Sequence, residues 1–335
     1  MTEYTTRGGM FRVPADLPEV PDHPVESKES FYNGFMIRAL KGLMRAQGIK
    51  ITVFGAEHLP TEGGALLAMN HTGYYDFIFG EVPGNVRGKR LVRFMAKKEI
   101  FEMPVIGNLM RRMDHVSVDR SSGRGSLEEA VHRLEQGQIV GIFPEATISR
   151  SFEIKELKTG AARIAAQADV PLIPMVIWGG QQIWTKEHPK RLGRTNTPVY
   201  IRLGEPVDPY GDPATATERL HTALVELMDQ VRGDYAAEYG PFPEGLYWMP
   251  ESLGGTAPSL EEAHRIDTED KARKKAAKEA KLAAKESREA AKLNARGDAA
   301  LRGEDGSSLP ATAKRSITGV ATKIRGLFRG LSGRN

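Results

Sequence analysis

A histidine and an aspartate lie five residues apart in the segment Asn70-His71-Thr72-Gly73-Tyr74-Tyr75-Asp76. A carboxylate that contacts an imidazole fixes its tautomer and stabilises the imidazolium, so the other ring nitrogen can take a proton from a hydroxyl group. This is the base half of a Ser-His-Asp triad, with a substrate alcohol in place of the serine. Residues five apart on a regular helix point about 140° away from each other, so we expect the chain to turn near Gly73. The pair predicts activation of a substrate hydroxyl.

A catalytic role for His71 needs support from a second polar segment, because a single histidine is more often structural than catalytic. Phe143-Pro144-Glu145-Ala146-Thr147 ends a run typical of a strand, and Ser149, Arg150, Lys155 and Lys158 follow it. Open α/β sheets bind ligands at the carboxyl ends of their strands. Both segments are therefore expected at the same edge of a sheet.

Four blocks follow one another along the chain: Asn70 to Asp76, Val116 to Arg120, Phe143 to Ser149, and Val170 to Pro174. Their succession resembles the lysophospholipid acyltransferase superfamily, which includes the glycerol-phosphate and lysophosphatidate acyltransferases. The resemblance covers roughly residues 28 to 235.

The resemblance implies roles for the matching residues. His71 is expected to be the general base and Asp76 the carboxylate that orients it. Arg120 is expected to bind the phosphate of the acceptor, and Glu145 and Thr147 to form part of the acceptor site. A second interpretation of Glu145, as a strand-end carboxylate that caps a neighbouring loop, stays open. The further substrate-binding candidates are Ser149, Arg150 and Lys158.

Two residues depart from the family pattern. Ala146 stands where the family has glycine, which suggests that this position does not need a positive φ. Ile148 stands where the family has arginine, so a guanidinium suited to bidentate phosphate binding is missing. Either Arg150 or Lys158 substitutes for it, or the acceptor is not the simple lysophosphatidate.

The resemblance implies transfer of a fatty acyl group from an acyl thioester to the hydroxyl of a lysophospholipid. The expected acceptor is 1-acyl-sn-glycerol-3-phosphate, which gives phosphatidic acid; a different lysolipid or a glycolipid is the alternative. We expect no cofactor and no metal, with acyl-CoA or acyl carrier protein as co-substrate. The chain contains no cysteine, which excludes disulfides, thiolate zinc sites and a thiol nucleophile.

Short runs rich in Val and Ile alternate with helical stretches, a pattern that predicts strands. The expected strands are 49–54, 65–69, 91–96, 115–118, 138–143, 171–178 and 199–203. Such alternation predicts one α/β domain with a mixed or mostly parallel sheet flanked by helices.

We expect three parts: a disordered leader over 1–26, the acyltransferase domain over 27–250, and a basic Ala/Lys-rich helix, linker and amphipathic tail over 251–335. Residues 27–47 predict an amphipathic helix. It either packs on the domain or lies on a membrane surface.

Positive charge is concentrated near the carboxyl terminus. Residues 271–296 hold ten Lys or Arg against three Glu, and 311–335 hold six against none, although the whole chain has a net charge of only +4. Residues 311–335 also carry an apolar stripe, as expected of a helix on an anionic bilayer. We expect an anionic membrane partner and a peripheral location at the cytoplasmic face of the plasma membrane.

Two other functions are disfavoured. A serine hydrolase would show a Gly-x-Ser-x-Gly elbow, which is missing. A nucleic-acid-binding protein could use the basic region, but residues 256–327 contain no aromatic side chains for base stacking.

Overall fold

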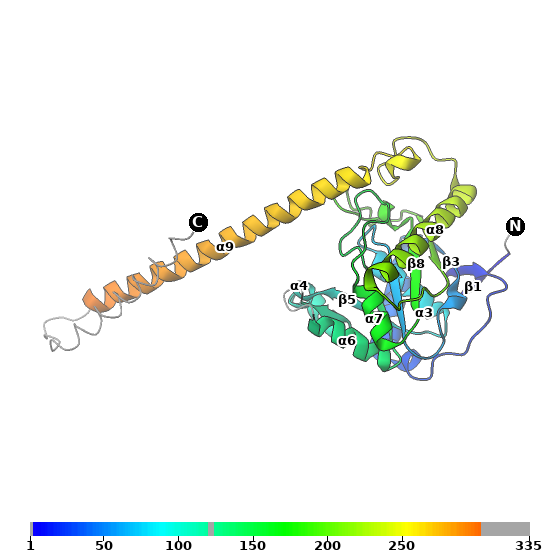
Figure 1. Cartoon of the computed structure of the whole chain (residues 1–335), viewed down its shortest axis with the longest axis horizontal. Helices are drawn as coiled ribbons and strands as arrows, with labels where there is room; N and C mark the ends of the chain where they lie inside the picture. Colours follow the sequence, from blue (N-terminus) through cyan, green and yellow to red (C-terminus); the bar gives the residue numbers. More distant parts are fainter. Residues whose placement is uncertain (1–2, 120–123, 303–335) are drawn as a thin grey trace. The chain divides into compact units, whose positions relative to one another are not determined.

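The structure is a computed structural model that describes residues 3–119 and 124–302 (Figure 1). These residues form one nine-stranded sheet in the order β1-β2-β3-β9-β8-β4-β7-β5-β6. The β1–β2 and β8–β9 pairs are antiparallel and the other ladders are parallel. The expected α/β fold with a mixed sheet is confirmed. The strands are β1 Tyr4–Arg7, β2 Phe11–Pro14, β3 Lys50–Phe54, β4 Ala65–Met69, β5 Val92–Lys97, β6 Val116–Val118, β7 Ile139–Ile142, β8 Leu172–Trp178 and β9 Pro198–Leu203.

Helices cover both faces of the sheet. Along β4, Leu66 and Ala68 pack into one apolar cluster with α6, α7 and α8. The alternate residues Leu67 and Met69 pack into a second cluster with α1, α2 and α3. Successive strand residues point to opposite faces, so a central strand covered on both sides is apolar throughout. The α-helices are α1 Ile37–Ala46, α2 Asp76–Gly80, α3 Val82–Val86, α4 Lys98–Phe101, α5 Ile106–Arg112, α6 Arg124–Glu135, α7 Gly160–Ala168, α8 Pro213–Tyr239 and α9 Leu260–Arg302.

Strand β4 lies between β7 and β8, and both of these ladders are parallel. The loops that leave the carboxyl ends of these three strands therefore meet at one edge of the sheet. This is the edge where open α/β sheets bind ligands.

The expectation of a disordered leader over 1–26 is wrong for the described residues. β2 pairs with β1 and, through Phe11 and Arg12, with β3. Phe11, Val13 and Leu17 are buried in the core. Strands this short gain their stability from the sheet they join and not from their own sequence, so composition gave no signal for them.

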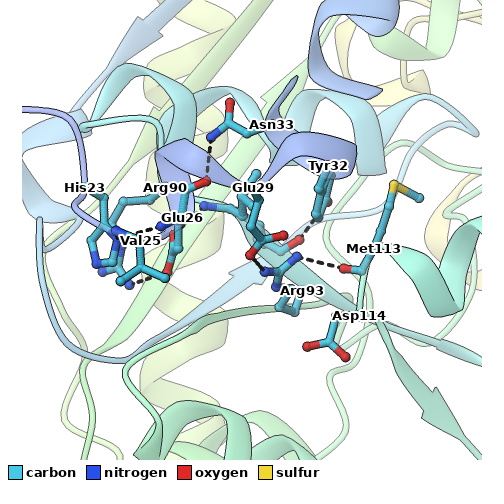
Figure 2. A network of polar contacts seen from close by, with 12 residues as sticks. His23, Val25, Glu26, Glu29, Tyr32, Asn33, Arg90, Arg93, Met113 and Asp114 are labelled. Carbon is cyan, nitrogen blue, oxygen red and sulfur yellow. Dashed lines mark hydrogen bonds and ion pairs between the residues drawn. The ribbon is translucent and has the colours of Figure 1, made fainter. Parts of the chain in front are cut away.

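A buried polar network fastens the next segment to the sheet (Figure 2). The side chain of Arg90 is 0% exposed and donates to the carboxylate of Glu26 at 3.1 Å. Arg93 pairs with Glu29 and donates to the Met113 carbonyl at 2.8 Å. Removing one partner of a buried ion pair costs about 3–5 kcal/mol. Residues 26–29 are therefore a fixed part of the domain.

The expected amphipathic helix over 27–47 is a π-helical turn, η2 Ser30–Met36, followed by α1. Ile37 and Met44 are buried, whereas Phe35 is 60% exposed and Leu43 is 40% exposed. One side of this segment packs on the domain, as the first interpretation predicted, and the other presents apolar side chains to solvent.

The chain divides into two units, Met1–Arg265 and Ile266–Asn335. Helix α9 runs into the second unit and confirms the helix expected from the Ala/Lys-rich composition. The amphipathic tail expected over 311–335 lies outside the described residues. Within the described part of the chain, every helix is too short or too polar to cross a bilayer.

Candidate active site

His71 follows β4, and Asp76 opens α2. The turn expected between them is present: His71 Nδ1 lies 3.0 Å from Asp76 Oδ2. The same oxygen accepts the backbone N–H groups of Thr72 at 2.7 Å and Gly73 at 2.8 Å. Asp76 thus closes the loop and fixes the imidazole with one carboxylate oxygen.

The chain turns near Gly73 without a positive φ at this glycine. A Cβ atom here would lie 2.9 Å from the carbonyl oxygen of Trp184, and the Gly73 N–H donates to Asp76. Glycine is therefore needed for a close approach of two backbones.

The two members of the pair differ in exposure. The side chain of Asp76 is 0% exposed, and that of His71 is 22% exposed. The His71 ring stacks on Phe143, with centroids 4.3 Å apart and planes 26° apart. Among the described residues, nothing hydrogen-bonds to Nε2 of His71. This nitrogen is available to a substrate hydroxyl.

Asn70 and Glu145 fix the backbone on either side of the histidine. The side-chain amide of Asn70 exchanges two hydrogen bonds with the backbone of Ile177 on β8, at 3.0 and 2.7 Å. Glu145 Oε1 accepts the His71 N–H at 2.7 Å, and the Ser149 N–H donates to the His71 carbonyl at 2.7 Å. The loops after β4 and β7 are therefore joined at His71.

Glu145 is 5% exposed, and its second oxygen accepts the Lys155 N–H at 3.3 Å. Burial raises the pKa of Glu145 to about 7, while the charge of Lys155 and the two N–H donors oppose the rise. This geometry supports the second interpretation of Glu145, as a carboxylate that caps a neighbouring loop, over a direct contact with the acceptor.

The interpretation of Ala146 is wrong, because this alanine has a φ of +62°. The left-handed conformation costs an alanine about 1–2 kcal/mol here, because its Cβ atom approaches a carbonyl oxygen. Ile148 is 4% exposed and belongs to the interior.

The remaining candidates lie in different environments. Thr147 Oγ1 accepts from Lys155 Nζ at 2.7 Å. Ser149 is 0% exposed and donates its hydroxyl to the Glu153 carbonyl, which favours a structural role over the ligand role expected for it.

The expected phosphate ligands also differ from one another. Arg150 is 8% exposed and forms an ion pair with Glu187. The Lys158 side chain is 69% exposed and lies 3.7 Å from a Glu156 carboxylate oxygen. Arg120 lies outside the described residues.

The loop after β8 is a part of the site that sequence reasoning missed. Thr185 Oγ1 donates to the Thr72 carbonyl at 2.7 Å, and the Tyr74 N–H donates to the Trp184 carbonyl at 2.9 Å. Lys186 Nζ donates to the Ile148 carbonyl at 3.0 Å. The residues of the loop after β8 belong to no catalytic motif, so only the parallel order of β8, β4 and β7 could have indicated that this loop takes part in the site.

This arrangement supplies a buried carboxylate, an oriented imidazole with one open nitrogen, and nearby cations. It is suited to deprotonating an alcohol that attacks an activated carbonyl. Among the described residues, no three His, Asp or Glu side chains converge as metal ligands would.

The chain is similar to several known proteins. A family model described as "Acyltransferase" matches residues 50–178. The 1-acyl-sn-glycerol-3-phosphate acyltransferase of Bacillus subtilis is 30% identical over 203 residues, which are 58% of this chain and 92% of that protein. The enzyme of the same name from Limnanthes douglasii is 32% identical over 145 residues, so this chain spans about half (49%) of its length. A crystal structure of the acyltransferase PlsC from Thermotoga maritima has a TM-score of 0.47 and 21% identity, covering 62% of this chain and 90% of that one.

Proposed function

Because this chain belongs to the acyltransferase family that includes the 1-acyl-sn-glycerol-3-phosphate acyltransferases, we propose that it acylates a lysophosphatidate. The acceptor is 1-acyl-sn-glycerol 3-phosphate and the product is phosphatidic acid. The donor is an acyl thioester, either acyl-CoA or acyl carrier protein, and no cofactor takes part.

The observation that carries this proposal is the His71–Asp76 pair, with Nδ1 held 3.0 Å from a buried carboxylate oxygen. His71 Nε2 takes the proton from the acceptor hydroxyl as its oxygen attacks the thioester carbonyl carbon. The tetrahedral intermediate then collapses and the carbon–sulfur bond breaks. The leaving thiolate takes from His71 the proton that came from the acceptor hydroxyl. The products are an ester and a free thiol, and the base is regenerated.

Direct transfer to the acceptor is favoured over an acyl-enzyme. Among the described residues, no serine or threonine hydroxyl bonds to the His71 ring, as the nucleophile of a triad would. The substrate alcohol therefore takes the nucleophile's place.

One assay tests the reaction and the acceptor together. Purified protein is incubated with acyl-CoA or acyl carrier protein and a panel of labelled lysophospholipids, beside His71→Ala and a control at an exposed histidine of α6, His132→Ala. We expect phosphatidic acid from lysophosphatidate, a loss of about a hundred- to ten-thousand-fold in His71→Ala, and full activity in His132→Ala. Preference for another lysolipid would contradict the acceptor, and thioester hydrolysis without an acylated lipid would contradict the reaction.

The acceptor phosphate is bound, in our proposal, by Arg120 together with Arg150 or Lys158. Substituting each with Met should raise the KM of the acceptor far more than that of the donor, because only the acceptor carries the lost contact. Arg150→Met also leaves Glu187 without its partner, so its folding must be checked by circular dichroism. Unchanged acceptor saturation in all three variants would place the phosphate elsewhere.

We also propose a peripheral location at the cytoplasmic face of the plasma membrane. Both lipids of the reaction reside in a bilayer, and Phe35 and Leu43 expose apolar surface beside basic residues. Fractionation of cells before and after a high-salt wash tests this location.

A further inference from the structure

Between residues 271 and 292, helix α9 carries most of its positive charge on one side. Residues 271–292 are exposed along their whole length in one continuous helix (Figure 1). Nine of them are Lys or Arg and three are Glu. At about 100° per residue, eight of the nine cations fall within an arc of about 140°. This basic stripe consists of Lys271, Lys274, Lys275, Lys278, Lys281, Lys285, Arg288 and Lys292.

The opposite side of the same helix is almost uncharged. An equal arc of about 140° holds eight alanines and Ser287, with Arg273 as its one cation. Alanine adds helix propensity and little apolar surface. This side therefore stabilises the helix but is too weakly apolar to enter hydrocarbon.

The carboxylates do not neutralise the stripe. Lys285 lies 3.8 Å from Glu289, a surface pair that contributes little. Glu289 is the one carboxylate within the basic arc, and Glu279 and Glu286 fall between the basic arc and the alanine arc. At about 1.5 Å per residue the stripe is about 32 Å long, and its cations remain exposed along that length.

We propose that the basic stripe of α9 lies flat on the anionic headgroups of a phospholipid bilayer. A straight row of exposed cations complements a flat layer of anionic phosphates, whereas base stacking on nucleic acid would need aromatic side chains that α9 lacks. The exposed side chain of Leu282, 57% accessible within the stripe, would contact the interface between the headgroups. The choice of a bilayer rests on the proposed function, because that reaction takes place on membrane lipids and produces an anionic one.

The contact is electrostatic and shallow. Each basic residue near an anionic surface strengthens binding about fivefold, so removing three should weaken it about a hundred-fold. Salt should weaken it as well, because exposed charges are screened over about 8 Å at physiological ionic strength.

The test uses the full chain in three forms and vesicles of phosphatidylcholine with about one third phosphatidylglycerol. The alanine variant carries Lys278→Ala, Lys281→Ala and Lys285→Ala, which lowers the net charge by three. The permuted variant adds Ala276→Lys, Ala280→Lys and Ala283→Lys, which restores composition and net charge but moves three cations to the opposite side. Lysine and alanine are both good helix formers, and circular dichroism checks that helicity is equal.

Sedimentation over a range of lipid concentrations gives the partition coefficient. We expect both variants to bind about a hundred-fold more weakly than the wild type, and all three to bind pure phosphatidylcholine vesicles equally poorly. If the permuted variant binds like the wild type, net charge matters and the stripe does not. If the variants keep vesicle binding and lose retention on duplex DNA, the partner is a nucleic acid. Either outcome overturns the proposal.

Activity on a short-chain, water-soluble lysophosphatidate separates this inference from the proposed function. Both variants should turn it over as the wild type does, because α9 supplies no group to the chemistry. A wild-type protein that binds vesicles through the stripe but acylates no lysolipid would contradict the proposed function and leave the stripe intact.

Discussion

Replacing Asp76 with Asn separates the charge of this residue from its geometry. Asp76 Oδ2 already accepts two backbone N–H groups, at 2.7 and 2.8 Å. The asparagine must place its carbonyl oxygen there, because its NH2 group would face two donors. That oxygen stays within reach of His71 Nδ1, so the tautomer is preserved and only the negative charge is lost.

The expected loss of activity can be worked out from the close contact of the two groups, in which Nδ1 and Oδ2 are 3.0 Å apart and the centres of the two delocalised charges are somewhat further apart. Two unit charges about 4 Å apart attract by about 4 kcal/mol at an effective dielectric constant of about 20. This energy corresponds to about a thousand-fold in rate. Because the proton is only partly transferred in the transition state, we expect kcat to fall by about a hundred- to a thousand-fold.

Stability should change less than activity. The NH2 group of the introduced asparagine would occupy the position of Asp76 Oδ1, which is buried and has no hydrogen-bond partner among the described residues. An unsatisfied buried donor costs about 1–3 kcal/mol, which denaturant unfolding measures. The variant should therefore stay folded.

The assay measures kcat with both substrates saturating, in Asp76→Asn, in His71→Ala and in the double variant. Because the carboxylate acts through the imidazole, the double variant should be no slower than His71→Ala. A folded Asp76→Asn protein with kcat within about fivefold of the wild type would refute the reasoning. So would a full additional loss in the double variant, since Asp76 would then act on the substrate by another route.

Three further changes test other contacts. Glu145→Gln should lower the free energy of unfolding by about 1–3 kcal/mol and reduce kcat, because the NH2 group of the glutamine would face the N–H donor of His71 or of Lys155. An unchanged melting temperature and kcat would contradict the role of Glu145 in joining the two loops. Ala146→Gly should be neutral or stabilise by up to about 1 kcal/mol, because glycine adopts positive φ without strain; clear destabilisation in urea would contradict this. Glu81 lies between α2 and α3, is 4% exposed and accepts the Val92 N–H at 3.2 Å. Burial raises its pKa from 4.5 to about 8. Glu81 is then protonated in the folded protein and ionised in the unfolded one, so its contribution to stability should fall as pH rises from about 5 to 8, by roughly 4 kcal/mol in total. A Glu81→Gln protein should lose this contribution and keep the smaller slope of the same sign that Glu145 gives below about pH 7; an unchanged slope would contradict the raised pKa of Glu81.

Seven strands could be predicted from sequence because each is a run of Val, Ile and other apolar residues with clear ends. Strands β1 and β2 could not, because their four residues gain stability only by pairing with each other and with β3. The short helices α2 to α5 were missed for a similar reason, since helices of four to seven residues are not stable by themselves.

In the site, the four ordered sequence blocks predicted that His71 and Asp76 meet, whereas the spacing of these two residues alone would not have been enough. The direction in which the Glu145 side chain points was not predictable, because it depends on the register between β4 and β7. This register places one carboxylate oxygen 2.7 Å from the backbone nitrogen of His71. The positive φ of Ala146 was predicted wrongly, because substitution of a glycine does not prove that the backbone has changed. A modest strain energy can be tolerated where neighbouring hydrogen bonds fix the loop.

The buried pair of Arg90 and Glu26 makes two distant stretches of the chain depend on each other. A recombinant fragment that begins at Ser27, the boundary that composition suggests, would retain a guanidinium with 0% exposure and lack the carboxylate opposite it. Besides losing strands β1 and β2, such a fragment would be destabilised by about a further 3–5 kcal/mol by the unpaired guanidinium, enough to aggregate during expression although every catalytic residue is present. For the same reason the two positions should covary among relatives, with apolar residues appearing at both or at neither.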